Sequence, residues 1–184
     1  MESGGTALAR NHPLLKSIDA VNDWVGRIVS LFILLMFLIL MLEIFARYLF
    51  NAPSVWANEL TQMLFGAYVV LSGGHLLWRG GHVGVDILYS RLSPRKKAML
   101  DVITSVLFFA FCVMMVYFGG SLAWESLARW EHSQSAWNPP LYPVKLTIPV
   151  GAILLLLQGV AKLVRDILVL TGTEPLAPAA PAQK

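Results

Sequence analysis

Two acids and an arginine stand at the end of an apolar stretch, in the sequence EIFARYLFNAPSVWANEL at residues 43–60. Glu43 and Arg47 are four residues apart, so they share one face of a helix and can form an ion pair. Glu59 follows across a short turn that contains Pro53 and begins the next apolar stretch. Because ionisable side chains are costly beside hydrocarbon, such a group indicates a specific role.

Three roles are open to this group. The side chains could contact a substrate or a coupling ion, or they could dock a partner subunit. They could also tie the turn together as a structural clasp. Glu43 and Glu59 lie at the same expected depth, near the membrane edge rather than at its centre, and the residues favour the clasp.

Other reactive side chains are few and scattered. Cys112 is the single cysteine and lies in an apolar stretch, so it can form no internal disulfide or CxxC metal site. His75 lies near one end of an apolar stretch and is interpreted as a hydrogen-bonding residue at a helix end. Haem ligation needs histidines at matching depth on facing helices, and the remaining three fall outside the apolar stretches: His12, His82 and His132. The sequence shows no nucleophile with a base and no metal-ligand cluster, and it predicts neither an enzyme nor a cofactor.

Composition identifies the elements that must position these residues. The chain has 184 residues, of which 57% are hydrophobic and only 14% charged, whereas a soluble domain has about 25% charged residues. The net charge of +3 does not indicate nucleic-acid binding, because the Lys and Arg residues lie between apolar stretches. The sequence therefore predicts an all-α integral membrane protein.

Four segments are long enough to span a membrane, for which about 20 mostly apolar residues are needed. The first is too long for the apolar region of a signal peptide and has no cleavage site after it. It is expected to remain in the membrane as a span. The predicted spans are residues 28–48, 60–78, 102–124 and 144–164.

The distribution of positive charge predicts the orientation of these spans. Lys and Arg are concentrated in the N-terminal tail, the second connection and the C-terminal tail. By the positive-inside rule, both termini and the second connection face the cytoplasm. The first and third connections then face the opposite side.

Flanking segments complete the predicted organisation. Residues 13–28 and 85–100 carry apolar residues at helical spacing opposite charged residues, which is typical of amphipathic helices at the membrane surface. The tail at 171–184 is rich in Pro and Ala and is predicted to be disordered. We thus expect a cytoplasmic tail with a surface helix at 1–27 and a four-helix membrane domain at 28–170.

Three motifs give the chain a family resemblance. They are ExxxRYxFNxPxxWxxEL at 43–60, RGGHVGVD at 79–86 and IPVGxxLLLLQ at 148–158. In this order, around four predicted spans, they resemble the small membrane subunit of the tripartite ATP-independent periplasmic (TRAP) transporters of bacteria. The resemblance runs from about Trp24 to Arg165.

The resemblance implies a role in the bacterial inner membrane. A large permease subunit would bind substrate and sodium, and a periplasmic binding protein would capture an organic acid. The small subunit would be a scaffold among membrane lipids that offers a docking surface. A freestanding small four-helix transporter is the alternative hypothesis, which the apolar middles of the spans disfavour.

The resemblance also selects two groups of residues, to which it assigns a bracing or docking role and no substrate contact. Family members often have two adjacent acids after the tryptophan, and here Asn58 replaces the first. The residues that match the outer hairpin motif are Glu43, Arg47, Tyr48, Pro53, Trp56 and Glu59. Those that match the inner connection are Arg79, Gly81, His82, Val83 and Asp86.

Overall fold

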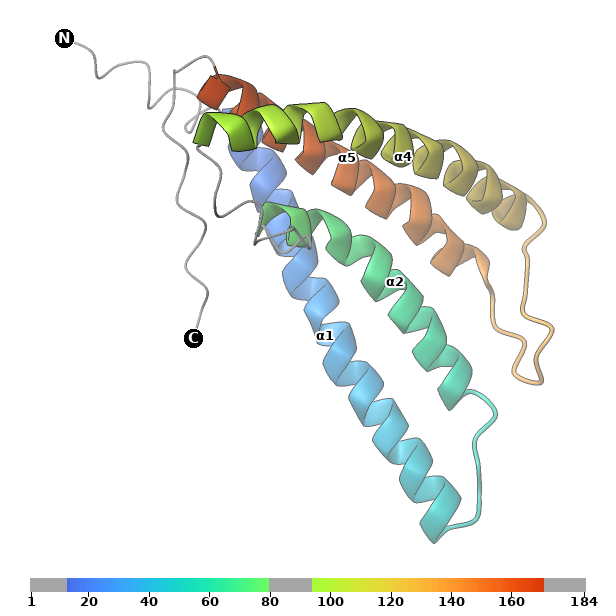
Figure 1. Cartoon of the computed structure of the whole chain (residues 1–184). Helices are drawn as coiled ribbons and strands as arrows, with labels where there is room; N and C mark the ends of the chain where they lie inside the picture. Colours follow the sequence, from blue (N-terminus) through green and yellow to red (C-terminus); the bar gives the residue numbers. More distant parts are fainter. Residues whose placement is uncertain (1–12, 80–93, 171–184) are drawn as a thin grey trace.

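The computed structural model describes residues 13–79 and 94–170, which form four long helices (Figure 1). Each helix is long and apolar enough to cross a membrane, and the described residues contain no strand beyond one isolated bridge. The predicted all-α membrane protein with four spanning helices is confirmed. The helices are α1 (Pro13–Leu49), α2 (Ala57–Trp78), α4 (Pro94–Ala128) and α5 (Tyr142–Leu170).

The first helix is longer than its predicted span. α1 has 37 residues and is therefore about 55 Å long at 1.5 Å per residue, whereas the hydrocarbon core is about 30 Å thick. Residues 13–28, expected to form a surface helix, are the first turns of α1, because no helix-breaking residue separates them from the span. α1 ends where Asn51 adopts a left-handed φ of 49° and the Ala52 N–H donates to the Ala46 carbonyl.

Some predicted features lie outside the described residues. They include the tail at 171–184, residues 85–93 of the second amphipathic segment, and four residues of the inner connection: Gly81, His82, Val83 and Asp86.

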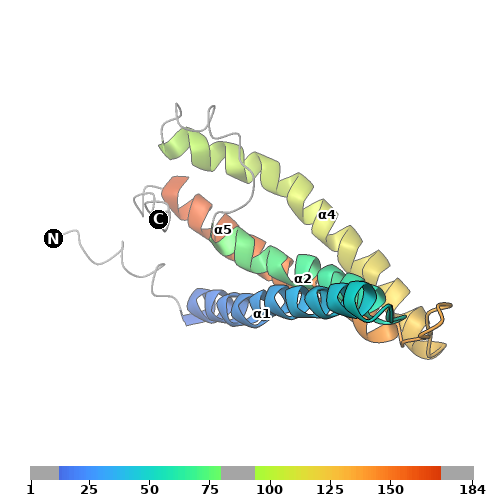
Figure 2. The same cartoon turned by 90° about the horizontal axis from the view of Figure 1, so that it is seen from below.

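The four helices form a twisted row rather than a closed bundle. α1 packs on α2, α2 on α5, and α5 on α4, while α1 and α5 share only a short contact. The helices are seen farthest apart near the start of α4 in Figure 2 and near the end of α1 in Figure 1. The row of helices therefore twists from one end of the helices to the other. A layer one helix thick buries only the side chains between neighbours. Large apolar side chains are consequently exposed on all of the helices.

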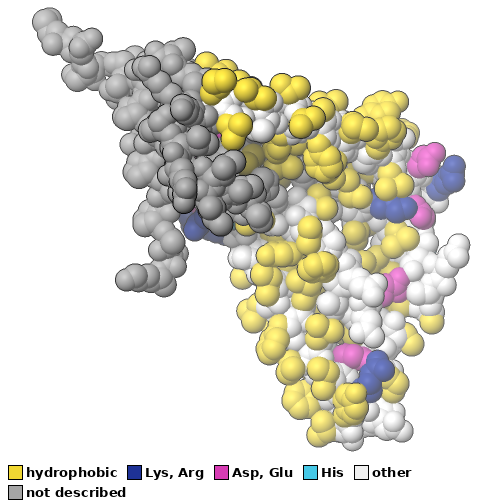
Figure 3. Space-filling model, in the orientation of Figure 1, with side chains coloured by type: hydrophobic (Ala, Val, Ile, Leu, Met, Phe, Trp, Pro, Cys, Tyr) yellow, Lys and Arg dark blue, Asp and Glu magenta, His cyan; other side chains and the backbone are white. Residues whose placement is uncertain are grey.

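The helices begin and end at two opposite ends of the molecule, the connection end and the tail end (Figure 1). The connection end holds residues 50–56, which join α1 to α2, and residues 129–141, which join α4 to α5. The tail end holds the start of α1 and the end of α5. On the face shown in Figure 3, charged side chains gather toward the connection end, and hydrophobic side chains cover the middle.

Glycines allow neighbouring helices to approach closely. A Cβ built on Gly151 of α5 would lie 2.6 Å from the Val70 carbonyl oxygen of α2, and this backbone atom cannot move aside independently. Gly74 and Gly119, each one member of a glycine pair within a helix, also lie too close to a side chain of a neighbouring helix to carry a Cβ without movement. Gly120, the residue after Gly119, has open space around its Cβ position. Small residues of this kind are typical of membrane helix interfaces.

We predict that Gly151→Ala destabilises the fold and that Gly120→Ala does not. Both substitutions add one methyl group and gain the same helix propensity, about 1 kcal/mol. Only the methyl at residue 151 meets the backbone of another helix, where overpacking costs about 1–3 kcal/mol. Thermal unfolding of both variants in detergent measures the difference, and equal midpoints would contradict the close α2–α5 contact.

Candidate functional site

The Glu43 carboxylate is the centre of a clasp at the connection end. Its Oε1 atom accepts hydrogen bonds from Arg47 Nε at 3.1 Å and from Arg47 Nη2 at 2.5 Å. Its Oε2 atom accepts from the Ser54 backbone N–H at 3.1 Å and from the Ser54 hydroxyl. Glu43 is only 5% exposed. We use "hairpin clasp" for Glu43, Arg47 and Ser54.

Ser54 extends the clasp to the next helix. Its hydroxyl oxygen also accepts a hydrogen bond from the Ala57 N–H at 3.3 Å, at the first residue of α2. One serine thus connects the last turns of α1 with the free N–H groups that begin α2. Sequence analysis did not select Ser54, although serine is a residue type that often accepts hydrogen bonds from the N–H groups at the start of a helix.

Glu59 takes part in a separate contact. Its Oε2 atom accepts a hydrogen bond of 2.5 Å from the Ser135 hydroxyl, in the α4–α5 connection. Nearby, the ring centroids of Trp56 and Trp137 lie 6.5 Å apart. The structure therefore joins Glu43 to Arg47, and it places Glu59 of α2 and Trp56 of the α1–α2 connection in contact with the α4–α5 connection. Of the other residues matched in the outer hairpin, Tyr48 and Pro53 are exposed.

The α4–α5 connection is itself a fixed loop. The backbone N–H of Leu141 donates to the Glu131 carbonyl at 2.9 Å, and Lys145 Nζ lies 2.5 Å from Glu131 Oε2. The hydrogen bond from Lys145 Nζ holds the pKa of the Glu131 carboxyl below its usual range. Because the pKa is lowered, this contribution to loop stability is present at neutral pH. It is lost only as the pH falls through the lowered value.

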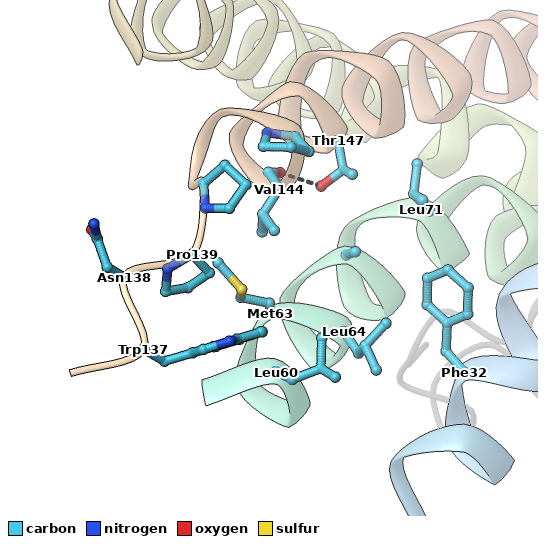
Figure 4. Close-up of a pocket in the computed structure, with 13 residues that line it drawn as sticks. Phe32, Leu60, Met63, Leu64, Leu71, Trp137, Asn138, Pro139, Val144 and Thr147 are labelled. Carbon is cyan, nitrogen blue, oxygen red and sulfur yellow. Dashed lines mark hydrogen bonds between the residues drawn. The ribbon is translucent and has the colours of Figure 1, made fainter. Parts of the chain in front are cut away.

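A groove runs between the helices beside this loop. It has a volume of about 570 Å³ and is open on one side. Figure 4 shows Phe32 of α1, Leu64 of α2 and Val144 of α5 around it, with Trp137 from the loop. The lining is mostly apolar, so the groove suits a hydrocarbon surface rather than a charged solute.

The tail end holds a second polar network, which sequence analysis did not predict. Asn22 Nδ2 donates to Gln158 Oε1 at 2.9 Å, and Gln158 Nε2 donates to Asp19 Oδ1 at 2.9 Å. Arg165 Nη2 donates to Asp19 Oδ2 at 2.6 Å. Asn22 and Gln158 are each 1% exposed. We call Asp19, Asn22, Gln158 and Arg165 the "tail network"; it joins α1 to α5.

The tail network changes the interpretation of the amphipathic start of α1. Residues 13–28 were expected to form an amphipathic helix at the membrane surface, and Asp19 and Asn22 belong to its polar face. In the structure this face packs inward, and the apolar Leu14 and Trp24 are exposed. In the folded chain, one side of α1 is buried at a seven-residue spacing, by Leu15, Asn22, Val29, Met36 and Glu43.

Neither polar site has the composition of a metal or catalytic centre. Across residues 13–79 and 94–170, no three His, Cys, Asp or Glu side chains come together in a way that could hold a metal ion. The hairpin clasp consists of an ion pair within α1 and hydrogen bonds to Ser54. The tail network consists of an ion pair and amide hydrogen bonds between α1 and α5. The geometry of both sites is suited to holding the helices in place.

Comparison with known proteins places this architecture in a family. Residues 36–169 match the family described as tripartite ATP-independent periplasmic transporters, DctQ component. The chain is also 27% identical over 105 residues to a protein of Haemophilus influenzae (strain 86-028NP) named sialic acid TRAP transporter permease protein SiaT. That match covers 57% of this chain and only 17% of the relative, which is a much longer protein. The chain therefore belongs to the DctQ family of TRAP small permease subunits and is a multi-pass inner-membrane transporter component, not an enzyme.

Proposed function

We propose that this subunit is the scaffold of a sodium-driven importer of an organic acid, in which a large permease subunit and a periplasmic binding protein are its partners. The proposal rests on the twisted row of helices. α4 packs on α5, and α1 packs mainly on α2, so most of the apolar surface of both edge helices is exposed. A partner subunit and lipid together would cover these faces.

The positions of charge support a partner that holds the transport sites. Residues 28–42, 60–74, 102–124 and 146–161 contain no Asp, Glu, Lys or Arg. Secondary transporters bind substrate and ions near the membrane midplane, commonly with polar or charged groups. We infer that substrate and sodium bind mainly to the large subunit, and that this chain supplies rigidity and a docking surface.

The substrate class is proposed at a coarse level. The relative is named for sialic acid, which is a carboxylate. A carboxylate substrate agrees with the organic acid implied by the sequence motifs, but 27% identity does not carry the particular compound over to this chain.

The proposed orientation places the tail end in the cytoplasm and the connection end in the periplasm. It follows from the concentration of Lys and Arg in the tails and the second connection. The loop at 129–141 would then face the binding protein. Its fixed conformation, with Glu131 paired to Lys145, suits a docking surface because little ordering would be needed on contact.

We expect the affinity-tagged chain to co-purify with a large permease subunit. Extraction in a mild detergent that preserves other membrane complexes, followed by a pull-down and mass spectrometry, tests this. A chain that migrates alone under those conditions contradicts the scaffold role.

The freestanding alternative predicts a different result. We expect liposomes that contain the purified chain alone to take up no organic acid in a sodium gradient, because the middles of the spans lack charged side chains. Liposomes with the complete transporter and its binding protein are the positive control. Uptake by the chain alone would support the alternative and overturn the scaffold proposal.

The hairpin clasp is proposed to fix the shape of a partner surface. We predict that Glu43→Gln lowers the yield of assembled transporter several-fold, since it weakens the hydrogen bonds from Arg47 and Ser54, and leaves substrate preference unchanged. Glu125→Gln is the matched control, because Glu125 and Arg129 form an exposed pair 4.0 Å apart. A changed order of preference among organic acids in the Glu43 variant would show that the clasp contacts substrate.

A further inference from the structure

The groove beside the α4–α5 connection has the depth of one membrane leaflet. Its mouth lies at the connection, where Trp137 lines it, and it reaches Phe32 of α1 and Leu71 of α2 (Figure 4). Leu60 and Leu71 are the first and last α2 residues of the lining and stand 11 residues apart, which is about 16 Å along a helix. Half of a hydrocarbon core about 30 Å thick is about 15 Å. The groove therefore runs from the membrane edge to about its middle.

The lining of the groove is apolar, and its backbone adds few hydrogen-bond donors. Three lining residues are prolines, which carry no N–H: Pro139, Pro140 and Pro143. The Thr147 hydroxyl is already donated to the Val144 carbonyl at 2.6 Å. Apolar cavities of this kind stay dry, because water finds too few partners in them. In a membrane, we expect hydrocarbon to fill the groove.

The volume of the groove suits a slender occupant better than a helix. A helix with its side chains is about 10 Å across, so a space of 570 Å³ would hold only about five residues of it. A helix of a partner subunit could lie across the opening without entering the groove. A flexible acyl chain can follow the whole length of the groove, and it belongs to the same leaflet.

An acid without a basic partner lies at the mouth of the groove. Glu59 Oε2 accepts a hydrogen bond from the Ser135 hydroxyl, whose oxygen accepts one from the backbone N–H of Asn138 at 3.1 Å. Asn138 is itself part of the lining. The other acids of the connection end each lie within 4.0 Å of an arginine or lysine. Glu59 forms no such ion pair within residues 13–79 and 94–170.

We propose that the groove binds one acyl chain of a phospholipid whose headgroup carries a primary ammonium, such as phosphatidylethanolamine, and that this ammonium pairs with Glu59. An ammonium N–H donates to a carboxylate in a charge-assisted hydrogen bond. A choline headgroup has the same positive charge but no N–H to donate, and a glycerol headgroup leaves the lipid with a net negative charge. The Trp56–Trp137 pair lies beside the mouth, as expected at the level of lipid headgroups.

Native mass spectrometry of the purified chain tests the choice of headgroup. The chain is mixed with equal amounts of dioleoyl phosphatidylethanolamine, phosphatidylcholine and phosphatidylglycerol, and the retained lipids are counted. We expect the ethanolamine lipid to be retained about threefold more than either other lipid, a modest preference because Glu59 is partly exposed. Glu59→Gln should abolish the preference. Glu125→Gln, which alters a 64% exposed acid at the same end, is the matched control and should keep it.

A second pair of variants tests the groove itself. Leu64→Trp places a larger side chain in the lining and should lower the retention of all three lipids several-fold. Val69→Trp is the matched control on α2, because Val69 is 49% exposed and lies outside the lining. Circular dichroism of both variants compares their helix content.

The proposal is overturned if the unaltered chain retains the choline or the glycerol lipid as well as the ethanolamine lipid, or if Glu59→Gln keeps the preference. Loss of the lipid from the assembled transporter would also overturn it, because a partner subunit would then occupy the groove. The experiment uses neither substrate nor sodium, so its outcome is separate from that of the proposed transport role.

Discussion

The helices of this protein gain little from the hydrophobic effect when they associate in a membrane, because lipid chains are as apolar as the side chains they would replace. Specific contacts must therefore hold the row together. The structure provides close approaches at glycine, such as Gly151 against Val70, and polar contacts at the two ends. The Gln158 side chain is the central polar contact, since it accepts from Asn22 and donates to Asp19 in a buried position.

The two polar sites also fix the register of α1. Asn22 and Glu43 lie on one buried seam with the apolar Val29 and Met36 between them, at seven-residue spacing. Sliding α1 along its neighbours would separate Asn22 from Gln158, and it would disturb the fit of the Glu43 clasp within its hairpin. A polar residue in an otherwise apolar seam is a recognised way to specify register. Apolar contacts in the middle of the seam would not distinguish one register from the next.

Sequence analysis could predict the features that depend on the spacing of residues within one segment of the chain. The four membrane helices follow from apolar segment length, and the Glu43–Arg47 pair follows from the four-residue separation on one helix face. The contacts of Glu59 with Ser135 and of Gln158 with Asp19 join residues far apart in the chain. No periodicity within one segment predicts which distant segment it will meet. For this reason Ser135 and the tail network became visible only in the folded chain.

Polar contacts at the ends and apolar surface in the middle have a common consequence. The hairpin clasp and the tail network hold α1 at both of its ends, and Lys162 adds an ion pair 3.0 Å long to Asp101 that joins α5 to α4. Because stability does not depend on a closed core, both faces of the row stay apolar and available. A layer built in this way can support another membrane protein without contributing a charged group to the centre of the membrane. That property matches a scaffold better than a pathway for solute.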